Sequence, residues 1–505
     1  MNRSKPIQGE LLSLKEEIEQ YAIDYGLTYY PVVFEVCNYE TICILAAQGG
    51  FPSRYPHWRF GMEYDQLSKG NIYGFQKIYE LVINTDPCYA YLLSSNRIVD
   101  QKLVMAHVYG HADFFKNNAW FRTTDKRMMD VMANHGTKIR KYMDKYGQDR
   151  VEAFIDAVNS LENLLDINVL FETAEVVRGR EELEKTAHEE NLREDDDDDV
   201  RSKVLRSYMK SKAKDDLTPE EVVVPNEKYD FKKIDKNVKG TRDIMKFLMQ
   251  NAPLEEWQSD IIGCLREEAY YFLPQRMTKI MNEGWASYWH SKIMTNNALK
   301  SSEIIDFADV HSGVMAMSQK SINPYKIGIE LFRDIEHRWD TGKFGKEYLE
   351  CTDMKKKESW DMKLGLGREK IFEVRKSHND ITFLDEYFTE EFCQRQQIFT
   401  YKYNPRTGRN EIETRDFQAI KQKLLQQLTN FGQPLIEIES SNYNNRGEIL
   451  LRHVHQGVDL DLSFAADTMK NIFYIWKRPV NIATVTEDKE YVYSYDGESF
   501  KPVKS

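Results

Sequence analysis

The amino-acid sequence predicts a mostly α-helical core followed by a small C-terminal α+β domain. Two observations support this fold class. Up to about residue 395, apolar side chains recur mainly every three or four positions, as in amphipathic helices. Beyond that point, short runs rich in β-branched and aromatic residues replace them. The chain has 505 residues, 41% of them hydrophobic and 30% charged, so it can form several domains with sizeable cores.

Helices are expected along most of the chain before residue 395. Residues 8–25 combine helical periodicity with charge pairs four positions apart. Two short apolar runs that follow, YYPVVFEV and ICILAA, fit either a strand or a buried helix. Helical periodicity dominates residues 70–180 and resumes at residue 241. Pro274 is expected to divide the long stretch 255–294, because proline cannot donate a helical hydrogen bond.

A change in composition separates the two helical parts. Residues 181–235 are strongly charged and have little apolar face, which predicts a linker or a solvated insertion. The acidic run Asp195–Asp199 within it is expected to be solvated surface. We therefore predict a helical N-terminal part, the charged segment, a second helical part and the α+β domain, at residues 1–180, 181–235, 236–397 and 398–505.

The C-terminal domain is expected to contain five strands and two helices. An Asp-Gly turn signal in YVYSYDGESF supports a hairpin there. The expected strands are QIFTYKYN, PLIEIES, EILLRHVH, VNIATVT and YVYSYDGES, and the expected helices are RDFQAIKQKLLQQLTNF and FAADTMKNIFYIW.

Composition also argues against several classes of protein. No apolar run approaches the roughly 20 residues that span a bilayer, and the N-terminus has no apolar segment of a secretory signal. Six scattered cysteines without CxxC spacing favour a reducing, cytoplasmic setting over disulfides or a thiolate zinc site. The net charge of −12 disfavours non-specific binding of nucleic acid.

The segment HVYGH places two histidines four positions apart. In a helix His107 and His111 share one face, so their imidazoles could bind one metal ion. Metalloprotease helices of this kind carry a glutamate directly after the first histidine as the general base, and Val108 stands here instead. Two interpretations remain open: a metal site, or two histidines packed and hydrogen-bonded in a core helix.

The segment MNEGWASYWH supplies a second candidate. Glu283 and His290 lie seven positions apart and so share a helix face among aromatic residues. A carboxylate in such surroundings is costly to bury unless it is paired or binds a cation. The alternative is an aromatic core helix in which Glu283 forms a salt bridge with an arginine such as Arg276.

Together the two segments resemble the zinc site of gluzincin metallopeptidases of the aminopeptidase type. The resemblance implies a metallopeptidase-like helical core in which His107, His111 and Glu283 bind the metal. The sequence departs from that pattern at Val108 and in the long separation of Glu283 from His111. A His2Glu set leaves one coordination position open, as catalytic zinc sites do.

Longer blocks resemble the stage V sporulation protein R (SpoVR) family. This family is associated with formation of the spore cortex, a peptidoglycan layer, and is also found in bacteria that form no spores. The resemblance implies a cytoplasmic role in envelope or stress physiology beside a PrkA-type serine protein kinase and a von Willebrand factor A-like protein, but it implies no agreed reaction. The blocks are YPHWRFG, VINTDPCYAYL, HVYGHADFFKNN, PQRMTKIMNEGWASYWH, INPYKIGIELFRDIEHRW and GLGREKIFEVRKSHND.

The combined hypothesis is a divalent metal site, with zinc as first choice and iron or manganese as alternatives, that acts on a peptide or peptidoglycan-related amide. His290 could be a fourth ligand or could orient one. With Val108 in place of the base, another group must transfer protons. The candidates are His290, Tyr109, Glu268 and His311. The rival hypothesis is a non-catalytic adaptor that works with the kinase and the von Willebrand factor A-like partner.

The remaining candidates favour structural roles. His57 lies between aromatic and basic residues, which suits a packed histidine. The glycine-rich segment 365–370 lacks a phosphate-binding motif and is expected to be a turn. His453 and His455 alternate along an expected strand, so they should share one face of a sheet.

Overall fold

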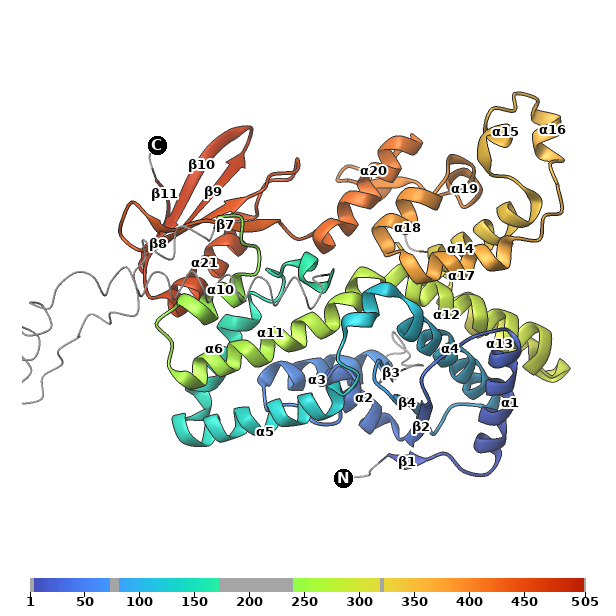
Figure 1. Ribbon diagram of the computed structural model, residues 1–505, viewed down its shortest axis with the longest axis horizontal. Helices are drawn as coiled ribbons and strands as arrows, with labels where there is room; N and C mark the ends of the chain where they lie inside the picture. Colours follow the sequence, from blue (N-terminus) through green and yellow to red (C-terminus); the bar gives the residue numbers. More distant parts are fainter. Residues whose placement is uncertain (1–3, 73–80, 172–238, 318–321, 504–505) are drawn as a thin grey trace, which may run out of the picture.

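The computed structural model describes residues 4–72, 81–171, 239–317 and 322–503. The predicted linker 181–235 lies outside these ranges. Most of the described residues are helical, and a small domain with a β-sheet lies at the C-terminal end of the chain. The predicted fold class is therefore confirmed (Figure 1). Among the described residues, no helix combines the length and apolar character needed to cross a membrane.

The N-terminal part contains a four-stranded sheet of order β1-β2-β4-β3. Strand β2 pairs parallel to β4, and the outer pairs are antiparallel. The two ambiguous apolar runs are now distinguished, because the first contains β2 and the second lies in helix α2. The strands are β1 (Lys5–Pro6), β2 (Val32–Cys37), β3 (Leu81–Ile83) and β4 (Cys88–Leu93), and α2 is Tyr39–Ala47.

Helix α4 (Ile98–Asn117) passes through the middle of the helical body, and sixteen of its residues are buried. It is too apolar on all sides to be a surface helix, as expected for a helix enclosed by others. The other helices of this part are α1 (Glu10–Asp24), α3 (Trp58–Ile72), α5 (Met128–Tyr146) and α6 (Gln148–Asn159).

Helices α11 (Glu256–Met277) and α12 (Lys279–Ile293) follow one another across the middle of the molecule and meet at an angle (Figure 1). The expected break occurs later than predicted, because α11 continues through Pro274 and ends at Thr278. The backbone carbonyl of Pro274 accepts hydrogen bonds from both the amide and the hydroxyl of Thr278, which satisfies the end of the helix.

Among the remaining helical segments, α14 (Pro324–Thr341) and α18 (Asp380–Tyr387) pack against α12, α10 (Ile244–Asn251) packs against α11, and α21 (Leu462–Trp476) packs against the C-terminal sheet. The other α-helices are α13 (Ile304–Val314), α15 (Gly345–Leu349), α16 (Met354–Glu358), α17 (Gly367–Ser377), α19 (Glu390–Arg395) and α20 (Phe417–Leu428). The short non-α turns are η1 (Ala119–Thr123), η2 (Ile167–Phe171), η3 (Met294–Ala298), η4 (Ser301–Glu303) and η5 (Thr429–Gly432).

The C-terminal part contains a five-stranded sheet of order β11-β10-β9-β8-β7 and a separate hairpin, β5-β6. All five expected strands and both expected helices are present, and Asp496-Gly497 lies in the turn between β10 and β11. Strands β6 and β11 were not predicted from the sequence. The strands are β5 (Thr400–Asn404), β6 (Arg409–Thr414), β7 (Ile436–Tyr443), β8 (Glu448–His453), β9 (Val480–Thr486), β10 (Lys489–Tyr495) and β11 (Phe500–Val503).

Hydrophobic cores connect the parts of the chain. Ile420 and Leu424 of α20 belong to the core around α4 and α12. Ile438 and Ile482 of the C-terminal sheet share a second core with Trp257 of α11. The residues after 398 therefore pack in two places: the segment with α20 joins the helical body, and the sheet covers the far end of α11.

Glycines allow α4, α12 and α14 to pack with their backbones in contact. A Cβ atom added at Gly110 of α4 would lie 2.6 Å from the Cα of Ala286 in α12. One added at Gly284 of α12 would lie 2.4 Å from the carbonyl carbon of Gly328 in α14. No side chain fits in such a space, so these helices keep their separation only with glycine at these positions.

We predict that Gly328→Ala destabilises the protein by about 3 kcal/mol, because the new methyl group would meet the backbone of α12. Urea unfolding at fixed pH measures the change. Gly313→Ala is the matched control: Gly313 also lies in a helix, but an added Cβ would meet nothing within 4 Å. That control should be neutral or stabilising by about 0.5–1 kcal/mol. Equal effects of the two substitutions would contradict the proposed close packing.

Candidate metal centre

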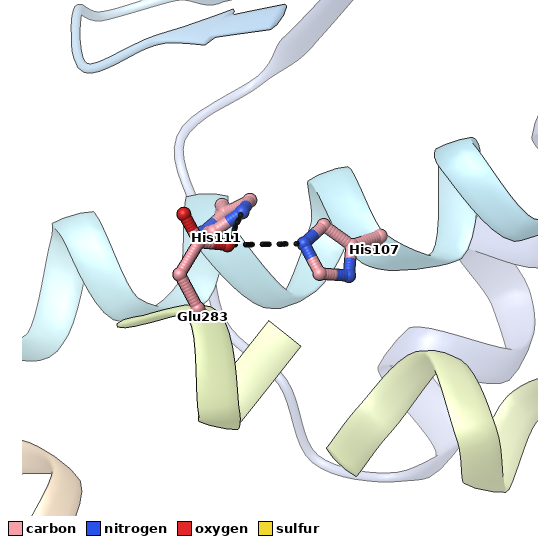
Figure 2. Close-up of side chains that lie close together, drawn as sticks. All are labelled: His107, His111 and Glu283. Carbon is pink, nitrogen blue, oxygen red and sulfur yellow. Dashed lines mark ion pairs between the residues drawn. The ribbon is translucent and has the colours of Figure 1, made fainter. Parts of the chain in front are cut away.

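Two adjacent helices bring the predicted ligands together. His107 and His111 project from one face of α4, and Glu283 projects toward them from α12 (Figure 2). One potential ligand atom from each of the three lies within 4.8 Å of the others. Within the described ranges, this is the only group of His, Cys, Asp or Glu found with such an arrangement.

The spacing fits a metal better than hydrogen bonds. The Oε2 atom of Glu283 lies 3.6 Å from Nε2 of His107 and 3.4 Å from Nε2 of His111. Hydrogen bonds from nitrogen to oxygen are shorter, at about 2.7–3.2 Å. Ligand atoms at bond lengths of roughly 2.0–2.2 Å from a tetrahedral zinc lie roughly 3.3–3.6 Å apart. The distances from Glu283 to the two histidines are therefore compatible with ligands of one metal ion.

The outer nitrogen of each imidazole is held by a second residue. Nδ1 of His111 lies 2.9 Å from Oδ1 of Asn282, which can only accept. This hydrogen bond favours a proton on Nδ1 of His111, so that a metal ion would bind at Nε2. Metal-binding histidines are commonly oriented by such a hydrogen bond from the other ring nitrogen.

His107 is held by a chain of two further histidines. Its Nδ1 lies 2.8 Å from Nδ1 of His290, whose Nε2 lies 3.1 Å from Nδ1 of His311. Burial, followed by the charge of neighbouring groups, lowers the pKa of His290 well below its usual value. A neutral His290 can accept from Nδ1–H of His107 and donate to His311, and a metal ion would then bind at Nε2 of His107.

The carboxyl group of Glu283 is held in its charged form. Burial alone would raise its pKa, but the adjacent imidazoles of His107 and His111 outweigh burial and hold that pKa well below its usual range. The alternative salt bridge with Arg276 is wrong: Nη2 of Arg276 donates instead to Oδ1 of Asn163, at 2.5 Å. Glu283 therefore faces only the histidines as ion-pair partners among the described residues.

A buried polar network fixes α4 against α12 and α17. Oδ2 of Asp113 accepts from Nε1 of Trp285, at 2.8 Å, and from Nη1 of Arg375, at 2.6 Å. Its Oδ1 accepts from the amide of Thr28, at 2.8 Å. Asp113 and Trp285 each lie two residues from a predicted metal ligand, so this network also fixes the relative position of those ligands.

The start of α12 is held by a carboxyl group from α18. Asp380 accepts hydrogen bonds from the amides of Ile280 and Met281, at 2.8 and 2.9 Å. Burial raises the pKa of Asp380 to about 7. These amides have no partner within the helix, so Asp380 satisfies them and orients the first turn of α12.

A cleft of about 410 Å³ opens beside the ligands. His111, Asn282 and Glu283 line it directly, whereas His107 lies behind them. The ring of Tyr325 also lines the cleft and lies nearly parallel to that of His107, with centroids 6.1 Å apart. The other lining residues are Gly49, Phe51, Leu81, Val82, Ile83, Phe115, Tyr271, Phe272, Gln275, Arg276 and Lys279.

None of the four proposed proton-transfer residues lines this cleft. His290 and His311 lie behind His107, as described above. Tyr109 packs against Tyr29 and Phe34 on the other side of α4, and burial raises its pKa strongly.

Glu268 belongs to a separate buried cluster. Its carboxylate pairs with Nη2 of Arg54, and its Oε1 lies 3.0 Å from Nδ1 of His135. Both oxygens of Glu268 are therefore engaged by cationic partners. The structure does not bring this carboxylate to the ligand group.

The weaker histidine candidates have structural partners. His57 is buried, with Nε2 3.2 Å from Oδ1 of Asp156. Nδ1 of His453 lies 2.9 Å from the hydroxyl of Thr484, and Nε2 of His455 lies 2.9 Å from Oδ1 of Asp459. The glycine-rich segment is not the expected turn: Gly365, with a φ of 65°, belongs to an irregular stretch, and residues 367–370 form the start of α17.

The sequence analysis missed three kinds of contributor to the site. Asn282 directly precedes Glu283 in the sequence, and this position next to a predicted ligand could have identified it as part of the site. Tyr325 lies in the quoted block INPYKIG, but nothing in its spacing places it near His107. Asp113 and Arg375 are far apart in the chain, and only the fold pairs them.

The cluster around Glu268 makes stability depend on pH. Burial opposes charge on His135, but its contacts with Cys264 and Glu268 outweigh burial and raise its pKa to about 10. A pKa above that of the unfolded chain stabilises the fold fully below about pH 6.5, and this stabilisation is lost as the pH rises toward 10.

We predict that His135→Gln costs about 1.5–3 kcal/mol at pH 6, because it removes a charged hydrogen-bond partner of a buried carboxylate. The difference from the wild type should shrink steadily between pH 7 and pH 10. Urea unfolding of both proteins across that range measures it. A difference that does not vary with pH would show that His135 is uncharged in the folded state.

Comparison with known proteins gives the chain its family. A family model described as "SpoVR like protein" matches residues 7–433, which include every candidate ligand. A protein of Escherichia coli (strain K12) named "Uncharacterized protein YcgB" is 27% identical over 496 residues, which cover 94% of this chain and 91% of that protein. No solved structure matches this chain. The resemblance drawn from the sequence blocks is thus confirmed, and the chain belongs to the SpoVR-like protein family.

Proposed function

We propose that this protein binds a divalent metal through His107, His111 and Glu283 and uses it in hydrolysis of an amide bond. The observation that supports this most is the spacing of two Nε2 atoms and one carboxylate oxygen at metal-ligand separations beside a cleft. The donor set suits zinc first, and iron or manganese also accept imidazole and carboxylate ligands.

A divalent metal in such a site lowers the pKa of a bound water and polarises a substrate carbonyl. The protein's own groups prepare the site for it. Asn282 and His290 hold the two imidazoles in the required tautomers, and Glu283 supplies a negative charge. The helix pair α4 and α12 keeps the three ligand atoms together without metal, which reduces the entropy lost on binding.

Proton transfer needs a group inside the cleft. Val108 is fully buried and has no proton to exchange. Among the residues that line the cleft, Tyr325 offers a hydroxyl on the side of His107. We propose that Tyr325 donates its proton to the leaving nitrogen and regains one from the attacking water, so that it would carry the proton that a glutamate base otherwise carries. The chain of His290 and His311 then serves to orient His107.

The proposed substrate is a peptide or a peptidoglycan-related amide. This assignment comes from the association of the family with spore cortex formation and rests on that association alone. The proposed location is the cytoplasm, which would limit the substrates to precursors, recycling products or proteins.

The second candidate function is an adaptor for a PrkA-type serine kinase and a von Willebrand factor A-like protein. One observation favours it: a cavity of about 810 Å³ between the C-terminal sheet domain and α20. Phe464 and Val458 line this cavity and are 73% and 59% exposed, respectively. If this surface is the working one, binding of such partners should be unaffected by substitutions at His111 or Glu283.

Metal analysis tests the first proposal. We predict about one zinc, iron or manganese per wild-type chain by inductively coupled plasma mass spectrometry. His111→Ala and Glu283→Gln should lower it to background, because each removes one of the three ligands. His453→Gln, at a buried histidine outside the group, should retain the metal. Absence of metal from the wild-type protein, even after incubation with each ion, would refute the proposal.

A further inference from the structure

Two cations, Lys279 and Arg276, line the cleft beside the candidate ligands, and among the described residues neither forms a direct ion pair. Charge interactions without direct contact link Arg276 to Glu162 and Lys279 to Asp380. Lys279 is exposed on the first turn of α12, and within the described residues it forms no ion pair. It lies one turn before Glu283 on the same helix face, yet the two side chains do not pair. Because Lys279 forms no direct ion pair with Glu283, its ammonium group can bind an anion in the cleft.

Arg276 is the second cation. It lies in the last turn of α11, where its guanidinium stands 4.6 Å from the ring centroid of Phe431 and donates to Asn163. These contacts orient the guanidinium without cancelling its charge, and burial lowers the pKa of Arg276. A guanidinium has five N–H donors, and the described contacts use only part of them. Arg276 can therefore still donate to an anion.

The cleft is also lined by apolar side chains. Phe51 and Phe272 pack edge to face there, with ring centroids 6.0 Å apart, beside Ile83 and Phe115. Such a surface binds an aromatic or aliphatic group, whereas the cations bind a negative charge. The candidate ligands lie along the same cleft, so one small molecule could touch all three surfaces.

We propose that the substrate is an anion, with a carboxylate or phosphate bound by Lys279 and Arg276 and an apolar group placed against Phe51 and Phe272. This inference rests on the proposed function, because it places the bond to be cut beside His111 and Glu283. It narrows the substrate class to amides that carry an acidic group close to an apolar one. Lys279 and Arg276 would act as specificity residues.

The test compares probes that differ only in charge. Phenylacetate, phenyl phosphate and the neutral phenylacetamide are titrated into the full-length protein by isothermal titration calorimetry, with and without zinc. We expect at least one anion to bind about tenfold more tightly than phenylacetamide, as charge-assisted hydrogen bonds allow. The stronger of the two anions identifies the acidic group as carboxylate or phosphate.

Variants assign the preference to the two cations. Lys279→Gln and Arg276→Gln should each weaken anion binding about tenfold and leave phenylacetamide unchanged. Lys141→Gln, at an exposed lysine of α5 outside the cleft, is the matched control and should change nothing. Because Arg276 also contacts Asn163 and Phe431, Lys279→Glu provides a second charge change at a position that is exposed.

The outcomes separate this inference from the metal proposal. Zinc binding without a preference for anions, or a preference that survives both charge substitutions, overturns the inference and leaves the metal proposal intact. An anion preference lost in both variants supports the inference. If zinc is not bound, the same loss in metal-free protein still supports the anion site and refutes only the metal proposal.

Discussion

The structure depends on the backbone contact of α4, α12 and α14. Gly110, Gly284 and Gly328 remove the Cβ atoms that would otherwise separate these helices. Because α4 carries both histidines and α12 carries Glu283, the helix separation sets the distance between the candidate ligand atoms. A methyl group at this contact would press on the backbone of the neighbouring helix, so the glycines also preserve the spacing of the ligands.

Buried polar groups also hold these helices in position. Asp113 binds Trp285 and Arg375, and all three side chains are buried. If α4 shifted along α12 or α17, the charge of Asp113 or Arg375 would stay buried without its partner. Asp380 fixes the first turn of α12 in a comparable way. The ligand group therefore lies between two buried carboxyl groups that hold its helices from either side.

The electrostatics of the site are asymmetric. Behind the ligands, His290 and His311 are kept neutral by burial and by nearby positive charges. In front of them, Glu283 stays charged and the cleft contains Lys279 and Arg276. A negative group bound in the cleft would therefore have both cations and the candidate ligands His111 and Glu283 in its lining.

The sequence by itself determined the helical body, the C-terminal sheet and the candidate ligands. Periodicity is a local property, so the expected strands and helices of the last domain were found, whereas the polar strand β6 was missed because it has little apolar alternation. His107 and His111 share a helix turn and were therefore paired from spacing alone. Glu283 was joined to them only through the resemblance to known ligand sets.

Tertiary structure decided everything that depends on distant residues. Glu268 could not be assigned from sequence, because its partner Arg54 lies far away in the chain and only the fold brings them together. Tyr109 lies two positions from His107 and therefore on nearly the opposite side of helix α4. Only the packing of α4 decides which of these sides faces the cleft. The cleft itself combines residues from separate segments of the chain, and its cations and apolar wall become neighbours only when the helices pack.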